Sequence, residues 1–159
     1  MNIYCAGKTQ NWRQVRVVQD LVRTTGHKIT YDWTANIVAD GGDSEEVGLP
    51  AARRSDYALM DMGGVYKADI LIALGHPNLC GTLWECGMAA TWGKNIWLVE
   101  WQHSRPSVFD HLPMVKKVPL MSLGVNLCFG SEKKLSLTPP RVFVEPDGSF
   151  RMEPAVERL

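Results

Sequence analysis

The chain has 159 residues, of which 45% are hydrophobic and 21% charged, and its 17 basic residues balance its 17 acidic residues. This length and composition predict one globular domain that folds without disulfides or a structural metal. The zero formal net charge argues against a nucleic-acid polymer as a partner, but it allows a small anionic ligand such as a nucleotide.

The N-terminal third of the chain alternates between strand and helix patterns. The apolar run Asn2–Ala6 predicts a strand. Apolar residues then recur at helical spacing from Trp12 to Val22, and the helix ends near Gly26. A second strand is predicted over Lys28–Tyr31. The stretch Ala35–Pro50 is predicted to be a loop, and loops of this length are often functional.

The central part of the chain predicts two further helices and two buried strands. A helix is expected over Ala51–Val65. The side chains that we expect it to place in the core are Ala52, Ala58, Leu59, Met60 and Met62. The apolar run Ala68–Leu74 is typical of a parallel strand buried on both faces. A turn follows at Pro77–Cys80, then a helix over Gly81–Trp92 and a buried strand over Asn95–Val99.

The C-terminal part predicts an edge strand and a hairpin. Val115–Met121 is the last parallel strand, at the edge of the sheet because Pro119 cannot donate a ladder hydrogen bond. The turn residues 146–148 separate two extended segments and predict a terminal β-hairpin. We therefore expect an α/β domain over residues 1–125. A C-terminal extension over residues 126–159 is expected to pack on this domain or on a partner subunit.

The alternation of strands and helices predicts an α/β fold with a flavodoxin-like, doubly wound five-stranded parallel sheet. Ligands in this architecture bind beyond the carboxyl ends of the strands. Residues 5–9, 74–82 and 101–105 therefore form the expected rim of a site.

The most informative segment is the helix that follows Ala68–Leu74. Gly81-Thr82 opens this helix at the carboxyl edge of the sheet, and Glu85 lies in its first turns among apolar neighbours. Backbone amides at a helix start favour an ionised carboxylate and can also bind phosphate. From spacing alone, Glu85 is either a charge that stabilises the helix or a functional group in a pocket.

This pattern resembles the nucleoside 2-deoxyribosyltransferase superfamily, which includes nucleoside 5′-monophosphate N-glycosidases. The resemblance covers about residues 1–100. The matching features are Ile3-Tyr4-Cys5-Ala6-Gly7, the stretch from Gly26 to Thr34 with Tyr31-Asp32-Trp33, Asp61 ahead of Ala68-Asp69-Ile70, and Gly81-Thr82 followed by Glu85, Gly87 and Ala89. It implies an N-glycosidase or 2-deoxyribosyltransferase that acts on nucleosides or nucleotides.

The resemblance also implies three catalytic residues. Glu85 would attack C1′ of the sugar, which fits the oxocarbenium character that builds up as a glycosidic bond breaks. Tyr4 would orient Glu85, and Asp61 would contact the sugar hydroxyls. From the residues alone, Tyr4 could equally be a packed strand aromatic and Asp61 a solvated helix charge.

One position departs from the family. Its transferases often place an aspartate six residues before the glutamate, where the acid protonates the leaving base, and this chain has Leu79 there. Base departure would then need His76, Asn78, a water or an easily protonated base. The monophosphate hydrolases of the family also lack this acid, which favours hydrolysis over transfer. The departure also keeps a non-catalytic nucleotide-binding module as the alternative.

A small anion site is expected beside Glu85. The amides of Gly81-Thr82 could hold a phosphate, with Lys8 or Arg13 nearby. Gly7-Lys8-Thr9 lacks the spacing of a Walker loop but could form an anion nest, whereas Lys8 could equally face solvent. Tyr31, Trp33 and Trp101 are candidates for stacking on a base, although buried packing is the default for each. The expected substrate-binding residues are Gly7, Lys8, Trp33, His76, Asn78, Gly81 and Thr82.

The remaining expectations concern partners, cofactors and location. The four histidines form no HxH or HxxxH group and the four cysteines form no CxxC pair, so we expect no metal and no cofactor. The chain opens without a secretory signal and holds no apolar run near the ~20 residues of a membrane span, which predicts a cytoplasmic protein with no membrane partner. The expected partners are a small-molecule nucleoside or nucleotide and a second copy of the chain, because family members commonly form homo-oligomers.

Overall fold

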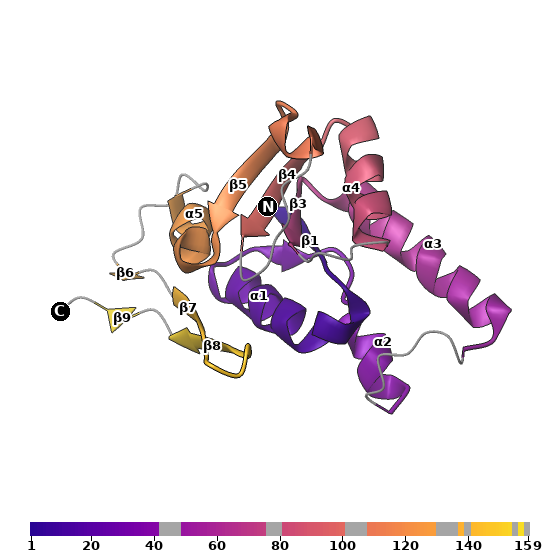
Figure 1. The fold of residues 1–159 in the computed structure, drawn as a ribbon, viewed down its shortest axis with the longest axis horizontal. Helices are drawn as coiled ribbons and strands as arrows, with labels where there is room; N and C mark the ends of the chain where they lie inside the picture. The colour runs from indigo at the N-terminus through magenta and orange to yellow at the C-terminus, as the bar shows by residue number, and fades with distance from the viewer. Residues whose placement is uncertain are drawn as a thin grey trace.

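The centre of the molecule is a five-stranded parallel sheet. The structure is a computed structural model that describes residues 1–41, 49–75, 81–100, 108–129, 137–138, 141–153 and 156–157. The strand order is β2-β1-β3-β4-β5 (Figure 1). The strands are β1 (Asn2–Ala6), β2 (Lys28–Ile29), β3 (Ile70–Leu74), β4 (Asn95–Glu100) and β5 (Val115–Pro119). This is the flavodoxin-like order, so the predicted fold class is confirmed.

Helices cover both faces of this sheet. On one side α1 (Trp12–Thr24) contacts α5 (Leu123–Phe129), and on the other α3 (Ala51–Lys67) contacts α4 (Gly81–Thr91) (Figure 1). The short helix α2 (Thr34–Ala39) contacts α1. Single 3-10 turns are η1 (Thr9–Asn11), η3 (Val108–His111) and η4 (Leu120–Ser122). No helix among the described residues is long and apolar enough to cross a membrane.

The core follows from the two periodicities of the sequence. All five residues of β3 are buried, as expected for a central parallel strand covered on both faces. In α1 the buried apolar side chains are Val15, Val18, Leu21 and Val22, which recur at the spacing of one helix face. Side chains alternate along β1, so Tyr4 points to the opposite face of the sheet from Ile3 and Cys5.

Three predicted elements differ from the structure. The first part of the expected loop Ala35–Pro50 belongs to the helix α2, which buries Ile37 against the core one turn after its N-cap residue Trp33, also buried there. Residues 42–48 of that loop lie outside the described part of the chain. β2 ends at Ile29 and not at Tyr31. β5 ends at Pro119, and the residues that follow it form η4.

The expected core contacts of α3 are wrong. Leu59, Met60 and Met62 are 63%, 51% and 42% exposed, and both alanines are exposed as well. The reason is that α3 meets the sheet near its C-terminal end, at Gly64 and Val65, which are its buried residues. A Cβ atom on Gly64 would lie 2.9 Å from the Tyr4 ring and 2.8 Å from Cβ of Tyr31. The apolar side chains on the rest of the helix therefore point away from the core.

The C-terminal extension contains the predicted hairpin. β7 (Arg141–Val144) pairs with β8 (Phe150–Glu153) in antiparallel register, and β6 (Leu137–Thr138) pairs with β9 (Val156–Glu157). β8 contacts α1, while β7 contacts η4 and α5. Helix α5 spans the expected boundary between residues 125 and 126. The hairpin is therefore held on the α1 side of the sheet, away from α3 and α4 (Figure 1).

Candidate active site

A cavity of about 480 Å³ lies at the predicted carboxyl edge of the sheet. Its walls come from the turn after β1, the start of α2, the N-terminal half of α3 and the start of α4. The lining residues are Gly7, Lys8, Thr9, Gln10, Trp33, Leu49, Arg54, Tyr57, Ala58, Asp61, Gly81, Thr82 and Glu85. The edge at which parallel strands end thus carries both the glycines and the carboxylates that the sequence singled out.

Three side chains from three elements meet at the cavity. The Tyr4 hydroxyl of β1 lies 2.7 Å from Oδ1 of Asp61 on α3 and 2.5 Å from Oε1 of Glu85 on α4. The Tyr4 ring is completely buried. The structure therefore brings together the three residues to which the resemblance gives catalytic roles, and those roles remain predictions.

The tyrosine in this group is a neutral hydrogen-bond donor. Burial raises the pKa of Tyr4 well above its ordinary value of 10.0, and the negative charges of Glu85 and Asp61 raise it further. A hydroxyl carries one hydrogen, so Tyr4 can donate fully to only one of the two carboxylates at a time. If another group donates a hydrogen bond to Asp61, the single hydrogen of the Tyr4 hydroxyl is available to Glu85.

Glycine positions fix this arrangement. Gly64 lets α3 approach the Tyr4 ring closely, because any Cβ there would overlap the ring. At the other wall, a Cβ atom on Gly7 would lie 2.4 Å from Cγ2 of Val15. The turn after β1 can therefore pass close to α1, which brings Lys8 to the rim.

The start of α4 lines the cavity, as the predicted anion site requires. Gly81 and Thr82 open the helix and line the cavity together with Lys8. Among the described residues, the buried Oγ1 atom of Thr82 has no hydrogen-bond partner. A buried polar atom normally has one, so this hydroxyl can bond a water or a ligand in the cavity. Glu85 lies beyond the first turn of α4, so the helix dipole contributes less to its charge than the sequence pattern predicts.

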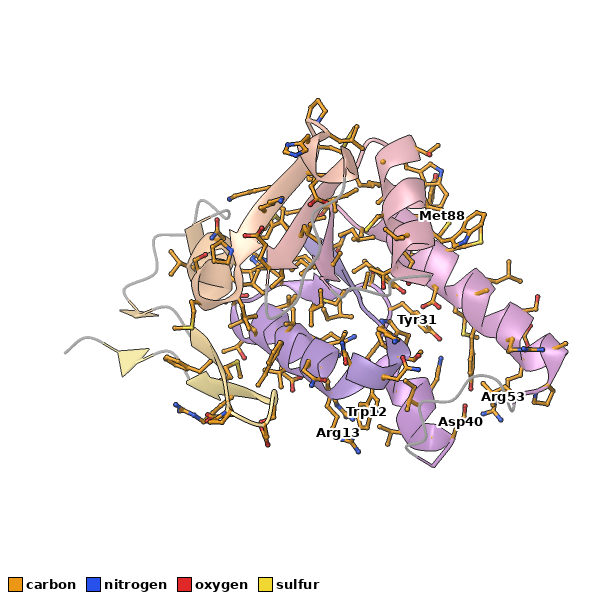
Figure 2. The ribbon with its side chains drawn as sticks, viewed as in Figure 1. Trp12, Arg13, Tyr31, Asp40, Arg53 and Met88 are labelled. Carbon is orange, nitrogen blue, oxygen red and sulfur yellow. The ribbon has the colours of Figure 1, made fainter. Side chains whose placement is uncertain are left out.

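The aromatic candidates occupy different places. Trp33 lines the cavity, and its Nε1 donates to the carbonyl of Cys5 at 2.8 Å, which fixes the indole plane. Tyr31 instead lines a second, more open groove on the other side of α3, together with Met60 and Gly64. Arg13 does not line the cavity but lies 4.6 Å over the ring of Trp12 (Figure 2). Of the two cations predicted for the anion site, Lys8 lines the cavity and Arg13 does not.

Two functional candidates on α3 were not found from the sequence. Arg54 and Tyr57 line the cavity one helical turn apart. The Tyr57 hydroxyl accepts from Nε of Arg53 at 2.8 Å and donates to Oδ2 of Asp40 at 2.9 Å. Arg53 also pairs with Asp40, which joins the end of α2 to the start of α3 (Figure 2). Charged residues at the exposed start of a helix are commonly solvated, so their spacing alone carried no signal.

Several expected residues lie outside the described part of the chain. These are His76, Asn78, Leu79, Cys80 and Trp101. Among the described residues, no group of three or more histidines, cysteines or acids could hold a metal ion. The described cysteines are Cys5, Cys86 and Cys128, and no disulfide joins any two of these three.

Comparison with known proteins gives a likeness of structure. No protein-family model matches the chain, and no curated protein matches its sequence. Among solved structures, the chain is similar to the CMP N-glycosidase BcmB of Clostridium botulinum. The TM-score is 0.50 and the sequence identity 14%, over 75% of this chain and 88% of that protein. The likeness shows a shared fold.

Proposed function

We propose that the chain is a cytoplasmic enzyme of nucleotide metabolism that hydrolyses the N-glycosidic bond of a nucleoside 5′-monophosphate, with Glu85 as nucleophile. The observation that carries the proposal is the Tyr4 hydroxyl, bonded to both Asp61 and Glu85 at the wall of a nucleotide-sized cavity. The fold shared with a CMP N-glycosidase supports the same reaction class.

The proposed reaction has two steps at C1′ of the sugar. In the first, the bond between C1′ and the base nitrogen breaks, its electron pair leaves with the base, and a Glu85 oxygen bonds to C1′. In the second, a water oxygen attacks C1′ and releases the carboxylate. The sugar gains the hydroxyl of that water and the base gains its hydrogen. Tyr4 donates to Glu85 and so holds the attacking oxygen in one orientation.

Asp61 is proposed to bind a sugar hydroxyl. A hydroxyl of the bound sugar donates to this carboxylate, which leaves the single Tyr4 hydrogen to Glu85. Substrate binding would thus align the nucleophile in the same step. This gives the Asp61 contact with Tyr4 a purpose that a solvated helix charge would not have.

The phosphate is proposed to lie at the start of α4. The Gly81 and Thr82 amides, the Thr82 hydroxyl and the Lys8 ammonium supply donors and positive charge there. This arrangement favours a 5′-monophosphate over a nucleoside. Leu79 at the family's acid position favours water over a second base as the acceptor, hence hydrolysis over transfer.

A chromatographic assay for free base tests this proposal. Wild type and Glu85→Gln would be incubated with ribo- and deoxyribonucleosides and their 5′-monophosphates, with and without an added acceptor base. We expect base release from a monophosphate by the wild type and a loss of at least roughly 1,000-fold in the variant. A new nucleoside formed with the acceptor would make the enzyme a transferase. Nucleotide binding by both proteins without release would make the chain a binding module.

We also propose that two copies of the chain pair through an apolar face on α3 and α4. This α3–α4 face consists of six exposed side chains: Leu59, Met60, Met62, Tyr66, Leu83 and Trp84. With 42% to 77% of each side chain exposed, the face presents on the order of 700 Å² per copy, close to the ~800 Å² that each partner contributes to a standard stable interface. Gly63 and Gly87 have open space beside them, which allows close approach of a second helix pair.

The α3–α4 face lies on the same two helices as the cavity residues Ala58 and Glu85. Light scattering coupled to size exclusion tests the pairing. The wild type is expected to be a dimer and Trp84→Asp a monomer. Met121→Asp, which changes an exposed residue on η4, is expected to stay dimeric. A monomeric wild type at micromolar concentration would contradict the pairing.

A further inference from the structure

One side of α3 runs along the whole cavity. Arg54, Tyr57, Ala58 and Asp61 line it at the i, i+3, i+4, i+7 spacing of a single helix face. With a rise of 1.5 Å per residue, Arg54 starts about 10 Å along the helix axis from Asp61. Arg54 nevertheless lines the same cavity as Asp61 and Glu85. The helix therefore presents a guanidinium to the cavity that holds the two carboxylates.

The lining residues of the cavity differ in chemistry. Gly81 and Thr82 at the start of α4 and Lys8 after β1 offer amides, a hydroxyl and an ammonium, as a phosphate requires. On α3, Tyr57 and Ala58 are aromatic or apolar, and they lie at i+3 and i+4 from Arg54 on the same helix face. A base suits such a wall, because its faces are apolar and its edge is polar. Arg54 is the cation next to these two residues on the helix.

The two neighbouring arginines of α3 have different surroundings. Arg53 is paired with Asp40 and bonded to the Tyr57 hydroxyl, so its charge is already compensated. Arg54 lines the cavity, and within the described part of the chain it makes no ion pair or side-chain hydrogen bond. Its guanidinium donors are therefore available to a ligand.

We propose that Arg54 stabilises the departing base by donating hydrogen bonds to a carbonyl oxygen on that base, which makes carbonyl-bearing bases the preferred leaving groups. This inference rests on the proposed N-glycosidase function. When the bond between C1′ and the base nitrogen breaks, the electron pair stays on the base and delocalises onto its carbonyl oxygen. The guanidinium faces that charge and keeps all its protons, because arginine does not deprotonate in proteins. Water later supplies the hydrogen that the base nitrogen gains.

This role would replace the protonation of the leaving base by the aspartate that the family's transferases often have. Leu79 cannot protonate a leaving base, so charge has to build up on the base as it departs. A fixed donor at the place where charge develops is an effective alternative to proton transfer. Uracil, cytosine, guanine and hypoxanthine carry such an oxygen, whereas adenine does not. We therefore expect 5′-monophosphates of the first four bases to be cleaved faster than adenosine 5′-monophosphate.

The test compares leaving groups in Arg54→Gln. One substrate is the carbonyl-bearing 5′-monophosphate that the wild type cleaves fastest. The other is the 4-nitrophenyl glycoside of the same sugar 5-phosphate, whose leaving group departs as a stable anion without assistance. Arg54→Gln is expected to lower kcat roughly 100-fold on the nucleotide, the effect of losing one transition-state donor. On the nitrophenyl substrate it should stay within about 3-fold of wild type, because that anion needs no such donor. Arg16→Gln, an exposed arginine on α1, is the control for both substrates.

Each outcome separates the two proposals. An equal loss on both substrates would overturn the inference, because Arg54 would then bind the phosphate or support the fold. No loss on either would overturn it as well. Glu85→Gln should abolish the release of both leaving groups. A wild type that releases neither would overturn the proposed function itself.

Discussion

Replacing Tyr4 by phenylalanine removes the hydroxyl that bonds both Asp61 and Glu85 while it leaves a completely buried ring in place. A hydrogen bond to a charged group contributes about 1.5–3 kcal/mol, and each 1.4 kcal/mol is a factor of ten in rate. If Tyr4 orients Glu85 in the transition state, kcat/KM should fall about 10- to 150-fold. The packing is nearly unchanged, so the free energy of unfolding should change by about 1 kcal/mol.

The pH profile of Tyr4→Phe adds a second, independent readout. The Tyr4 hydrogen bond favours the ionised form of Glu85, so without it the acid limb of kcat/KM should move to higher pH. Steady-state base release over a pH series measures both effects. Tyr31→Phe is the control, because its hydroxyl bonds Met60 and Asn36 in the groove on the other side of α3. Unchanged kcat/KM and an unchanged acid limb in Tyr4→Phe would refute the orienting role.

Three further predictions follow from the same structure. Because the pKa of Tyr4 is raised well above 10.0, base release should show no loss from tyrosine ionisation between pH 8 and pH 10, and a fall that tracks tyrosinate absorbance would contradict this. Burial raises the pKa of Cys86 to about 12 and that of Cys5 further, whereas the unfolded thiols ionise near their ordinary value of 9.0. The contribution of these two thiols to stability is therefore fully present below pH 9. Above pH 9 the unfolded thiols lose their protons while the folded ones keep them, so the free energy of unfolding, measured by urea denaturation, should fall by about 1.4 kcal/mol per pH unit for each thiol. Gly64→Ala should cost about 1–3 kcal/mol and most of the activity, because its Cβ overlaps the Tyr4 ring, whereas Gly63→Ala meets open space and should be neutral or stabilising.

The sheet and its order could be predicted from the sequence because buried parallel strands leave a direct signal. Ile70–Leu74 is an uninterrupted apolar run. Between such strands, apolar residues at helical spacing indicate the helices that connect one strand to the next. The helix α2 was missed because six residues give too short a window for a periodic pattern. The signal available was the spacing of two buried apolar residues, Ile37 in the helix and Trp33 at its N-cap, which are one turn apart.

The exposed apolar residues of α3 show that the sequence alone does not tell which apolar side chains lie in the core. Leu59, Met60 and Met62 have the hydrophobicity of core residues, yet they lie on the surface. Burial in a core and burial in an interface require the same side chains, so a single sequence does not distinguish them. The partners of these residues depend on where α3 meets the sheet, and Gly64 determines that position.

The candidate site was predictable in part. The carboxyl ends of parallel strands meet at one edge, which places the turn after β1 and the start of α4 together. The contact of Tyr4 with Glu85 was suggested by the family resemblance and not by spacing, whereas the contact of Asp61 with the same hydroxyl was not predicted. Arg54 and Tyr57 were missed because a polar helix face towards a cavity has the same spacing as one towards solvent.

The central claim is that Glu85 forms a bond to the sugar. Intact-mass spectrometry of the protein after incubation with a 2′-fluoro analogue of a cleaved 5′-monophosphate tests it most directly. The fluorine destabilises the oxocarbenium-like transition states, so the sugar ester of the enzyme accumulates where its hydrolysis is slower than its formation. The account predicts a mass increase of one fluorinated sugar phosphate, located by peptide mapping on Glu85 and absent in Glu85→Gln. Release of base by the wild type with no adduct, or an adduct on another residue, would contradict it.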